Sequence, residues 1–199
     1  MLDPVGSFLD HFNSVGSFLD HVIVAARTLD EGSDWVEARL GVRPVPGGKH
    51  ALMGTHNRLL KLGPRVYLEV IAIDPDAPAP QRSRWFALDE PEMIERLEQG
   101  PALIHWVVRT EAIDAEARRC PDAIEVLEAS RGPYRWRIGV PSDGRLPCGG
   151  RCATLIQWEG EAHPADALPD SGCTLEVLDT AGASPRARIA TPRGAVTLE

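Results

Sequence analysis

The sequence lacks the features of a membrane or nucleic-acid-binding protein. No apolar run approaches the ~20 residues that a helix needs to cross a bilayer. The net charge is -8 and the arginines are scattered, whereas binding to phosphate backbones needs a clustered basic surface. We therefore expect a small-molecule substrate or ligand as the partner, with no nucleic acid and no membrane, and we allow for a homodimer.

Cysteine is also scarce. The four cysteines are Cys120, Cys148, Cys152 and Cys173. A zinc knuckle built on Cys148 and Cys152 would need a second pair at close spacing, and the sequence has none. The N-terminal segment has neither the basic cluster nor the cleavage site of a secretory signal. We therefore expect free thiols and a cytoplasmic location.

What is present is ordinary globular composition. Hydrophobic residues make up 43% of the 199 residues and charged residues 25%. This length allows one substantial core, or two small modules that share one.

A segment near the N-terminus occurs twice. Residues 5–11 and 15–21 both read VGSFLDH, but only the second copy continues into a strand-like apolar run. We interpret residues 1–14 as an appended leader that is mobile or loosely packed. His21 is therefore a better functional candidate than His11.

Hydrophobic periodicity predicts the same order of helix and strands in both halves of the chain. In the first half it predicts a strand at 18–26, a helix at 30–40, an extended piece at 42–46, and strands at 56–62 and 66–73. In the second half it predicts a strand at 103–109, a helix at 112–119, and strands at 124–129, 134–140 and 153–158. Asp30 or Ser33 would cap the first helix, and residues 46–48 would form a turn.

This order predicts an α+β fold of two βαβββ modules. The first module spans residues 15–80, and residues 81–102 form a linker with a short helix near 90–98. The second module spans residues 103–199 and carries a β-rich extension at its C-terminal end.

The two halves align on polar residues. The segment around His21 aligns with that around His105, and the segment around Glu69 aligns with that around Gln157. Each of these four residues lies in an apolar strand, where a carboxylate costs several kcal/mol to bury unless it is paired or bound. Two imidazoles, a carboxylate and an amide oxygen suit a divalent ion such as zinc, nickel, iron or manganese.

The stretch from Leu19 to Pro75, with LIQWEG, HPADALP and TPRGAVTLE further on, resembles the glyoxalase-like branch of the vicinal oxygen chelate superfamily. The resemblance implies that the paired modules curve into a mixed β-sheet cleft. It also implies metal ligands at His21, Glu69, His105 and Gln157, with Glu69 as a catalytic base. Glutamate is commoner than glutamine at the last position, so Gln157 argues against a mechanism that needs a second carboxylate. The cleft without a metal stays an alternative, because many members have lost the ion.

A second polar group could reach the mouth of the cleft and bind substrate. Its members are His50, His56, Asn57 and Arg58. The alternative is a polar loop followed by an exposed strand start. Trp85-Phe86 and the aromatic residues of 134–137 could line a pocket or pack in the core.

Two functions follow. The first is an enzyme of lyase, isomerase or dioxygenase type that uses the metal as a Lewis acid. If only the two histidines and Glu69 bind, the site is a 2-His-1-carboxylate triad. The second is a non-catalytic protein that binds or sequesters a small molecule in the same cleft. The resemblance assigns no substrate.

The leader interpretation predicts that residues 1–14 are dispensable. A chain that begins at Val15 should keep the melting temperature of the full chain, because the first copy of the repeated segment has no strand after it. Thermal unfolding of both chains measures this. A large drop in melting temperature would show that the leader packs on the core.

Overall fold

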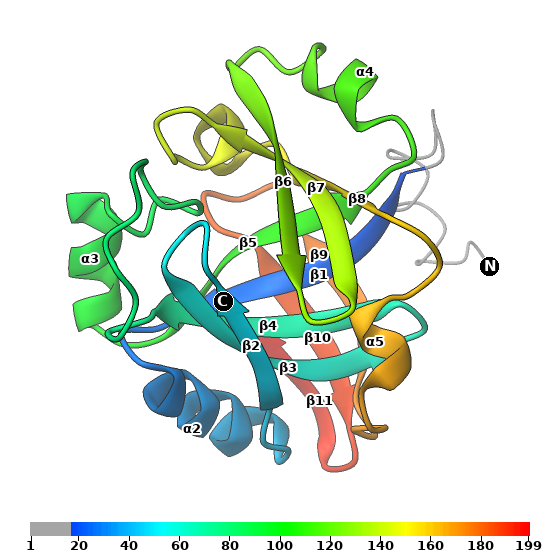
Figure 1. Ribbon diagram of the computed structural model, residues 1–199. Coiled ribbons are helices and arrows are strands. Elements are labelled where there is room, and N and C mark those ends of the chain that lie inside the picture. The colour runs from blue at the N-terminus through cyan, green and yellow to red at the C-terminus, as the bar shows by residue number, and fades with distance from the viewer. Residues whose placement is uncertain (1–16) are drawn as a thin grey trace.

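The computed structural model describes residues 17–199, and the predicted leader lies outside them (Figure 1). The first module consists of β1 (Phe18–Ala25), α2 (Leu29–Leu40), β2 (Val45–His50), β3 (Thr55–Gly63) and β4 (Val66–Ile73). The second consists of β5 (Ala102–Arg109), α4 (Ile113–Ala117), β6 (Ile124–Arg131), β7 (Tyr134–Pro141) and β8 (Thr154–Trp158). The connecting segment carries α3 (Pro91–Glu98), and a short 3-10 turn, η1 (Pro147–Gly150), precedes β8.

Each module contributes four neighbouring strands to one mixed sheet. The strand order is β2-β3-β4-β1-β5-β8-β7-β6, so the two modules meet where β1 pairs with β5. Within each module the first and last strands are parallel, and the others pair in antiparallel fashion. The predicted α+β fold of two βαβββ modules is confirmed, because the pattern of pairing in the first module recurs in the second.

The strand pair β1–β5, which joins the two modules, contains two matching β-bulges. Asp20 is an extra residue on β1 between the pairs Leu19–Val108 and His21–Val107. Ile104 is the extra residue on β5, next to His105. Such bulges place two successive side chains against one partner residue and re-aim them. The two bulges occupy equivalent places, so the structure supports the alignment of His21 with His105.

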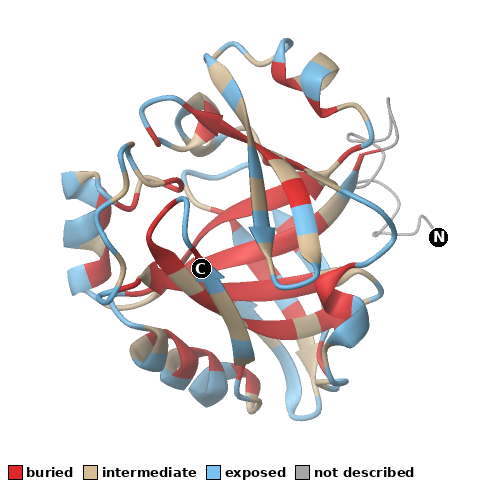
Figure 2. Cartoon of the chain, viewed as in Figure 1, coloured by how far each residue is buried: buried red, intermediate tan, exposed pale blue. Residues whose placement is uncertain are grey.

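The sheet separates two apolar layers. Its outer face packs against α2 and against a second sheet made of β9 (Thr174–Asp179), β10 (Arg186–Thr191) and β11 (Gly194–Leu198). Its inner face packs against α3 and the segment with Trp85 and Phe86. Figure 2 shows the central strands as the most continuously buried part of the chain. Within residues 17–199 no helix is long and apolar enough to cross a membrane.

The sheet curls until its two edges come into contact. Arg131, the last residue of β6, donates a hydrogen bond from Nη1 to Asn57 Oδ1 on β3 at 2.8 Å. Its side chain also packs against Gly48 on β2, where a Cβ would approach Arg131 Cδ to 2.5 Å. The contacts of Arg131 therefore cover the inner face of the sheet between the two modules. The family resemblance predicts a cleft at this position.

Two local predictions differ from the structure. Thr28, rather than Asp30 or Ser33, caps α2, and its hydroxyl accepts the Glu31 N–H at 3.1 Å. Residues 46–48 lie in strand β2 instead of a turn. Proline is tolerated there because β2 is an edge strand, and the Gly48 N–H is satisfied by Asn57 Oδ1 at 3.0 Å.

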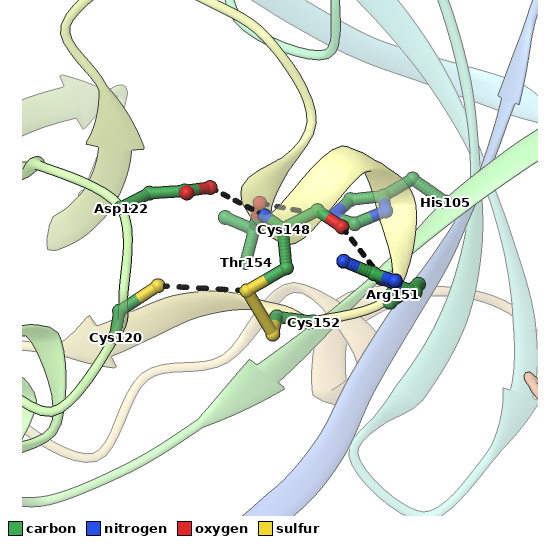
Figure 3. Close-up of a disulfide and its surroundings, with 7 residues drawn as sticks. All are labelled: His105, Cys120, Asp122, Cys148, Arg151, Cys152 and Thr154. Atoms are coloured by element: carbon green, nitrogen blue, oxygen red, sulfur yellow. Dashed lines mark hydrogen bonds between the residues drawn. A yellow bond between two sulfur atoms is a disulfide. The ribbon is translucent and has the colours of Figure 1, made fainter.

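The prediction of free thiols is wrong for two of the four cysteines. Cys148 and Cys152 form a disulfide (Figure 3), whereas Cys120 and Cys173 are free thiols. Cys148 and Gly149 adopt left-handed conformations, with φ of 53° and 64°. The resulting turn brings the two Cα atoms to 5.4 Å, within the range that a disulfide spans. Spacing in the sequence does not reveal this backbone geometry.

The second sheet should contribute to the stability of the whole fold. Ile189 on β10 is fully buried against the outer face of the main sheet. We expect Ile189→Ala to lower the free energy of unfolding by about 2–5 kcal/mol, because it removes buried methyl groups and leaves a cavity. Val177→Ala, at a 41% exposed position of β9, is the control and should change it by less than about 0.5 kcal/mol. Urea unfolding measures both, and equal effects would show that the second sheet is not part of the core.

Candidate functional site

The structure brings His21 and Glu69 together on the inner face of the sheet. They lie on the parallel neighbours β1 and β4, where Ile23 is the register partner of Glu69. His21 Nε2 is 3.5 Å from Glu69 Oε2, and both residues are about 95% shielded from solvent, with 4% and 5% exposed. A basic nitrogen and a carboxylate oxygen therefore face each other in a largely dry environment.

Asp20 determines how His21 is oriented. Its Oδ1 accepts a hydrogen bond from His21 Nδ1 at 2.6 Å. Its Oδ2 accepts one from Trp158 Nε1 at 2.8 Å and one from His163 Nε2 at 3.0 Å. With its proton on Nδ1, His21 presents the lone pair of Nε2 to Glu69. A carboxylate partner of this kind fixes both the tautomer and the ring orientation of a histidine ligand.

The carboxyl of Asp20 is held ionised although it is fully buried. Desolvation alone would raise its pKa, but the hydrogen bonds from His163 and His21 and their charges outweigh burial and leave the pKa well below the ordinary value. His163 can donate from Nε2 because its Nδ1 accepts the N–H of Ala165 at 3.2 Å. This chain of contacts makes Asp20 a fixed anion at the Nδ1 edge of the His21 ring.

The other oxygen of Glu69 is held by the first module. Asn57 Nδ2 donates to Glu69 Oε1 at 2.5 Å, and His50 Nε2 lies 3.9 Å from the same oxygen. Asn57 Oδ1 in turn accepts from Arg131 of the second module. Because Asn57 occupies Oε1, Oε2 is the oxygen of Glu69 that faces His21.

His50 is a neutral acceptor in this network. Its Nδ1 lies 3.0 Å from Thr55 Oγ1, and its Nε2 lies 3.3 Å from Asn57 Nδ2 and 3.4 Å from Arg131 Nη1. Burial lowers its pKa to about 4, although the charge of Glu69 opposes this. Two N–H groups that point at Nε2 require an unprotonated nitrogen there, so His50 takes the tautomer with its proton on Nδ1.

Aromatic rings enclose the cluster. Tyr67 stacks on His21 with ring centroids 4.5 Å apart, and Trp85, Phe86, Trp136 and Trp158 complete the wall. The cavity that these residues line has a volume of about 20 Å³. This is enough for one water molecule or an ion, which needs at least ~10–15 Å³. A larger ligand could enter only if the aromatic wall moves.

His105 lies on the same inner face but is not part of this cluster. Its Nε2 is paired with Thr154 Oγ1 at 3.1 Å (Figure 3). Its Nδ1 is buried and has no hydrogen-bond partner among residues 17–199. Burial, followed by the charge of His21, lowers its pKa to about 3. Thr154 pairs with Val107, as Glu69 pairs with Ile23, so the register makes Thr154 the counterpart of Glu69.

The structure places Gln157 away from the other three predicted ligands. Its Nε2 donates to the Glu111 carbonyl at 3.1 Å, and its Oε1 accepts from the Ile113 N–H at 3.4 Å. Side chains alternate along β8, and the flanking Ile156 and Trp158 line the cavity. Gln157 therefore lies on the opposite face and holds the start of α4. The sequence alignment matches Gln157 with Glu69. In the strand register, the counterpart of Glu69 is Thr154.

Because side chains alternate along a strand, the four predicted substrate-binding residues lie on two different faces of the sheet. His50 and Asn57 line the cavity. His56 and Arg58 lie on the other face of β3, where Arg58 donates to Asp30 at 2.7 Å and to Ser33 at 3.0 Å. His56 Nδ1 is 4.0 Å from Asp74 Oδ1. Arg58 thus ties β3 to α2.

Sequence reasoning missed Asp20, His163 and Arg131. Asp20 directly precedes His21, and a carboxylate in an apolar strand was a usable signal. His163 and Arg131 carry no such local signal. Both reach the cluster through long-range packing: His163 is 143 residues from its partner Asp20, and Arg131 is 74 residues from Asn57. Spacing along the chain does not contain that information.

The pair formed by His21 and Glu69 fits two positions of a metal site. Ligands at about 2.1 Å from a tetrahedral ion lie about 3.4 Å apart, and the observed separation of Nε2 and Oε2 is 3.5 Å. Among residues 17–199, no third His, Cys, Asp or Glu ligand atom completes a cluster with these two atoms within 4.8 Å. The 2-His-1-carboxylate arrangement is therefore not assembled, and water or substrate would have to supply the other ligands.

Paired βαβββ modules joined at their first strands define the vicinal oxygen chelate class of fold. Within that class, the family described as "Glyoxalase-like domain" matches residues 19–192, and the chain belongs to this family. Structural comparison agrees on the fold. A hypothetical protein from Staphylococcus aureus superposes with a TM-score of 0.53 and 12% identity, covering 91% of this chain and 84% of that one.

Two other solved structures superpose with lower TM-scores. Methylmalonyl-CoA epimerase from Mycobacterium tuberculosis has a TM-score of 0.45 and 21% identity, with 73% of this chain and 89% of that one covered. A hypothetical protein from Bacillus halodurans has a TM-score of 0.47 and 13% identity, with 74% and 97% covered. No curated protein matches the sequence.

Removing the charge of Asp20 should destabilise the fold. We expect Asp20→Asn to lower the free energy of unfolding at pH 7 by about 1–3 kcal/mol, because an amide cannot accept all three buried donors. The control is Asp76→Asn, at an exposed carboxylate. Urea unfolding at several pH values measures both variants.

The contribution of Asp20 to the free energy of unfolding should change with pH in a defined direction. The pKa of Asp20 is depressed by folding, so its contribution is present above the ordinary value of 3.8 and is lost as pH falls below it. The difference between the parent chain and Asp20→Asn should therefore be constant from pH 7 to about 5 and shrink in more acidic solution. A difference that grows on acidification would contradict the assignment of Asp20 as a buried anion.

Proposed function

We propose that this protein is a small-molecule enzyme of the glyoxalase-like type, with a divalent metal held by His21 and Glu69 and chemistry of the lyase, isomerase or dioxygenase kind. The observation that carries the proposal is the buried pair of His21 Nε2 and Glu69 Oε2, 3.5 Å apart, with His21 oriented by Asp20. When bound there, zinc, nickel, iron or manganese would supply Lewis-acid stabilisation of an oxyanion or enolate.

Glu69 is the proposed catalytic base. Asn57 holds its Oε1, so Oε2 is the oxygen that would take a proton from a substrate carbon or hydroxyl when Glu69 leaves the metal during turnover. Arg131 bonds to Asn57 rather than to the carboxylate itself. The positive charge is thus kept one residue away from Glu69.

The aromatic wall would exclude water and select the substrate. A cavity of about 20 Å³ admits little beyond an ion, so binding requires Trp85, Phe86 or Trp136 to move. Arg131 borders the same cavity and would attract a substrate with a carboxylate or another anionic oxygen. We therefore propose a small, oxygen-rich and partly apolar substrate. A homodimer and a cytoplasmic location belong to the same proposal.

A second candidate is a non-catalytic protein that binds or sequesters a small molecule in the same cleft. The observation in its favour is the second module, where Thr154 replaces a carboxylate, His105 is paired with Thr154, and Gln157 faces away. A site with ligands from one module alone would hold a metal weakly. The two candidates differ in whether the purified chain retains a metal.

Elemental analysis of the purified protein distinguishes them. With the disulfide left oxidised, we expect about one divalent ion per chain, and we expect His21→Ala to lose most of it. His56→Ala is the matched control and should keep it, because His56 lies on the other face of β3. Gln157→Ala should also keep it. Binding should weaken as pH falls, because protons compete for the imidazole and the carboxylate.

Equal metal content in the parent chain and His21→Ala would overturn the metal site. The sequestering function would then be favoured, and calorimetric titration with candidate small acids would be the next measurement.

A further inference from the structure

A second cluster of metal-binding side chains lies outside the proposed active site. Cys120 and Asp122 follow α4, and they extend toward Cys148 and Cys152 in the loop before β8 (Figure 3). Cys120 Sγ is 3.9 Å from Cys148 Sγ, and Asp122 Oδ2 accepts the Cys148 N–H at 2.5 Å. One ligand atom from each of Cys120, Asp122 and Cys148 lies within 4.8 Å of the other two.

The separation of the sulfur atoms fits a tetrahedral ion. Two thiolates bound to zinc at about 2.3 Å lie about 3.8 Å apart, which matches the observed 3.9 Å. A disulfide needs its sulfur atoms in covalent contact, and Cys148 can form only one such bond. Cys120 Sγ is therefore not bonded to Cys148 Sγ, but it lies at the distance expected for two sulfur ligands of one ion.

The backbone around the cluster also has the form of a metal-binding loop. Cys148 and Cys152 flank a turn in which Cys148, Gly149 and Gly150 all have positive φ. Arg151 Nε donates to the Cys148 carbonyl at 3.1 Å and fixes the turn. Paired ligands at close spacing are typical of structural zinc sites. The sequence has no second cysteine pair at close spacing, but folding brings Cys120 and Asp122 to this position.

We propose that Cys120, Asp122, Cys148 and Cys152 form a zinc site when the Cys148–Cys152 disulfide is reduced. A thiol reductant breaks the disulfide: two RSH give two cysteine thiols and RSSR. Zinc then displaces the protons of the three thiols and binds the Asp122 carboxylate as its fourth ligand, with release of three protons. The disulfide form cannot bind zinc in this way, because two of the sulfur atoms are consumed.

An ion can reach this cluster from solvent. Cys120 and Cys152 line a pocket of about 420 Å³ with Arg119, Arg151 and Glu116. The same pocket is lined by Trp106 and Val108, which belong to the core on the outer face of the sheet, whereas His21 and Glu69 lie on the inner face. The zinc site is therefore separate from the proposed active site, and the two can be tested independently.

Bound zinc would tie two loops of the second module together. Residues 120–122 lead into β6, and residues 148–152 lead into β8. Because the disulfide lies within the second loop alone, it cannot link the loops, and the zinc site would. Zinc should therefore stabilise the reduced chain, since an ion that binds only the folded state adds its binding free energy to folding.

Cobalt titration tests the proposal. Addition of Co²⁺ to protein reduced with a phosphine should produce a thiolate-to-cobalt charge-transfer band, and Zn²⁺ should abolish it. The same protein with its disulfide intact should show no band. This band reports sulfur ligands alone, so a metal at His21 and Glu69 does not affect the result.

Three variants identify the ligands. Cys120→Ser should weaken binding by more than the roughly 10–100-fold that loss of an outer partner costs, and Asp122→Asn should weaken it by a smaller factor. Cys173→Ser, at a buried free thiol outside the cluster, should bind like the parent chain. Circular dichroism checks that each variant is folded.

Two outcomes would overturn the proposal. One is a reduced, folded parent chain that gives no charge-transfer band. The other is Cys120→Ser with the affinity of the parent chain, which would mean that Cys148 and Cys152 bind cobalt as an isolated pair.

Discussion

The buried carboxylate of Asp20 is the constraint on which the site depends. It has no exposure to solvent and accepts hydrogen bonds from His21, Trp158 and His163, so it connects β1 with β8 and with the segment that follows β8. A buried charge is tolerated only when its hydrogen-bonding capacity is filled. The three donors must therefore come together for the chain to fold, and their assembly also orients His21 toward Glu69.

The bulge at Asp20 makes this assembly possible. In a regular strand, Asp20 and His21 would point to opposite faces of the sheet. The extra residue on β1 allows both side chains to serve the inner face, while Leu19 and Val22 pack on the outer face. The equivalent bulge at Ile104 has no carboxylate. There His105 is paired with Thr154. The second module therefore repeats the bulged strand and its histidine, but it has no carboxylate beside that histidine.

Most of the fold could be predicted from the sequence, because it depends on local periodicity. Strands such as 66–73 and the helix that ends at Gly41 follow from apolar spacing and from glycine at a left-handed position. Half of the site could be predicted on the same basis, since His21 and Glu69 are polar residues in apolar strands. Gln157 could not be placed, because an odd shift in register, here the three residues from Thr154 to Gln157, changes the face, and a single sequence does not fix the register. The contact of Arg131 with Asn57 depends on the curvature of the sheet, which local patterns do not encode.

The central claim is that Asp20 holds His21 with Nε2 free to bind a metal beside Glu69. Nitrogen-15 NMR of the His21 ring above neutral pH tests this directly. The account predicts a proton on Nδ1, an unprotonated Nε2, and a large shift of the Nε2 resonance when a divalent metal is added. A proton on Nε2, together with a ring spectrum that metal leaves unchanged, would contradict it.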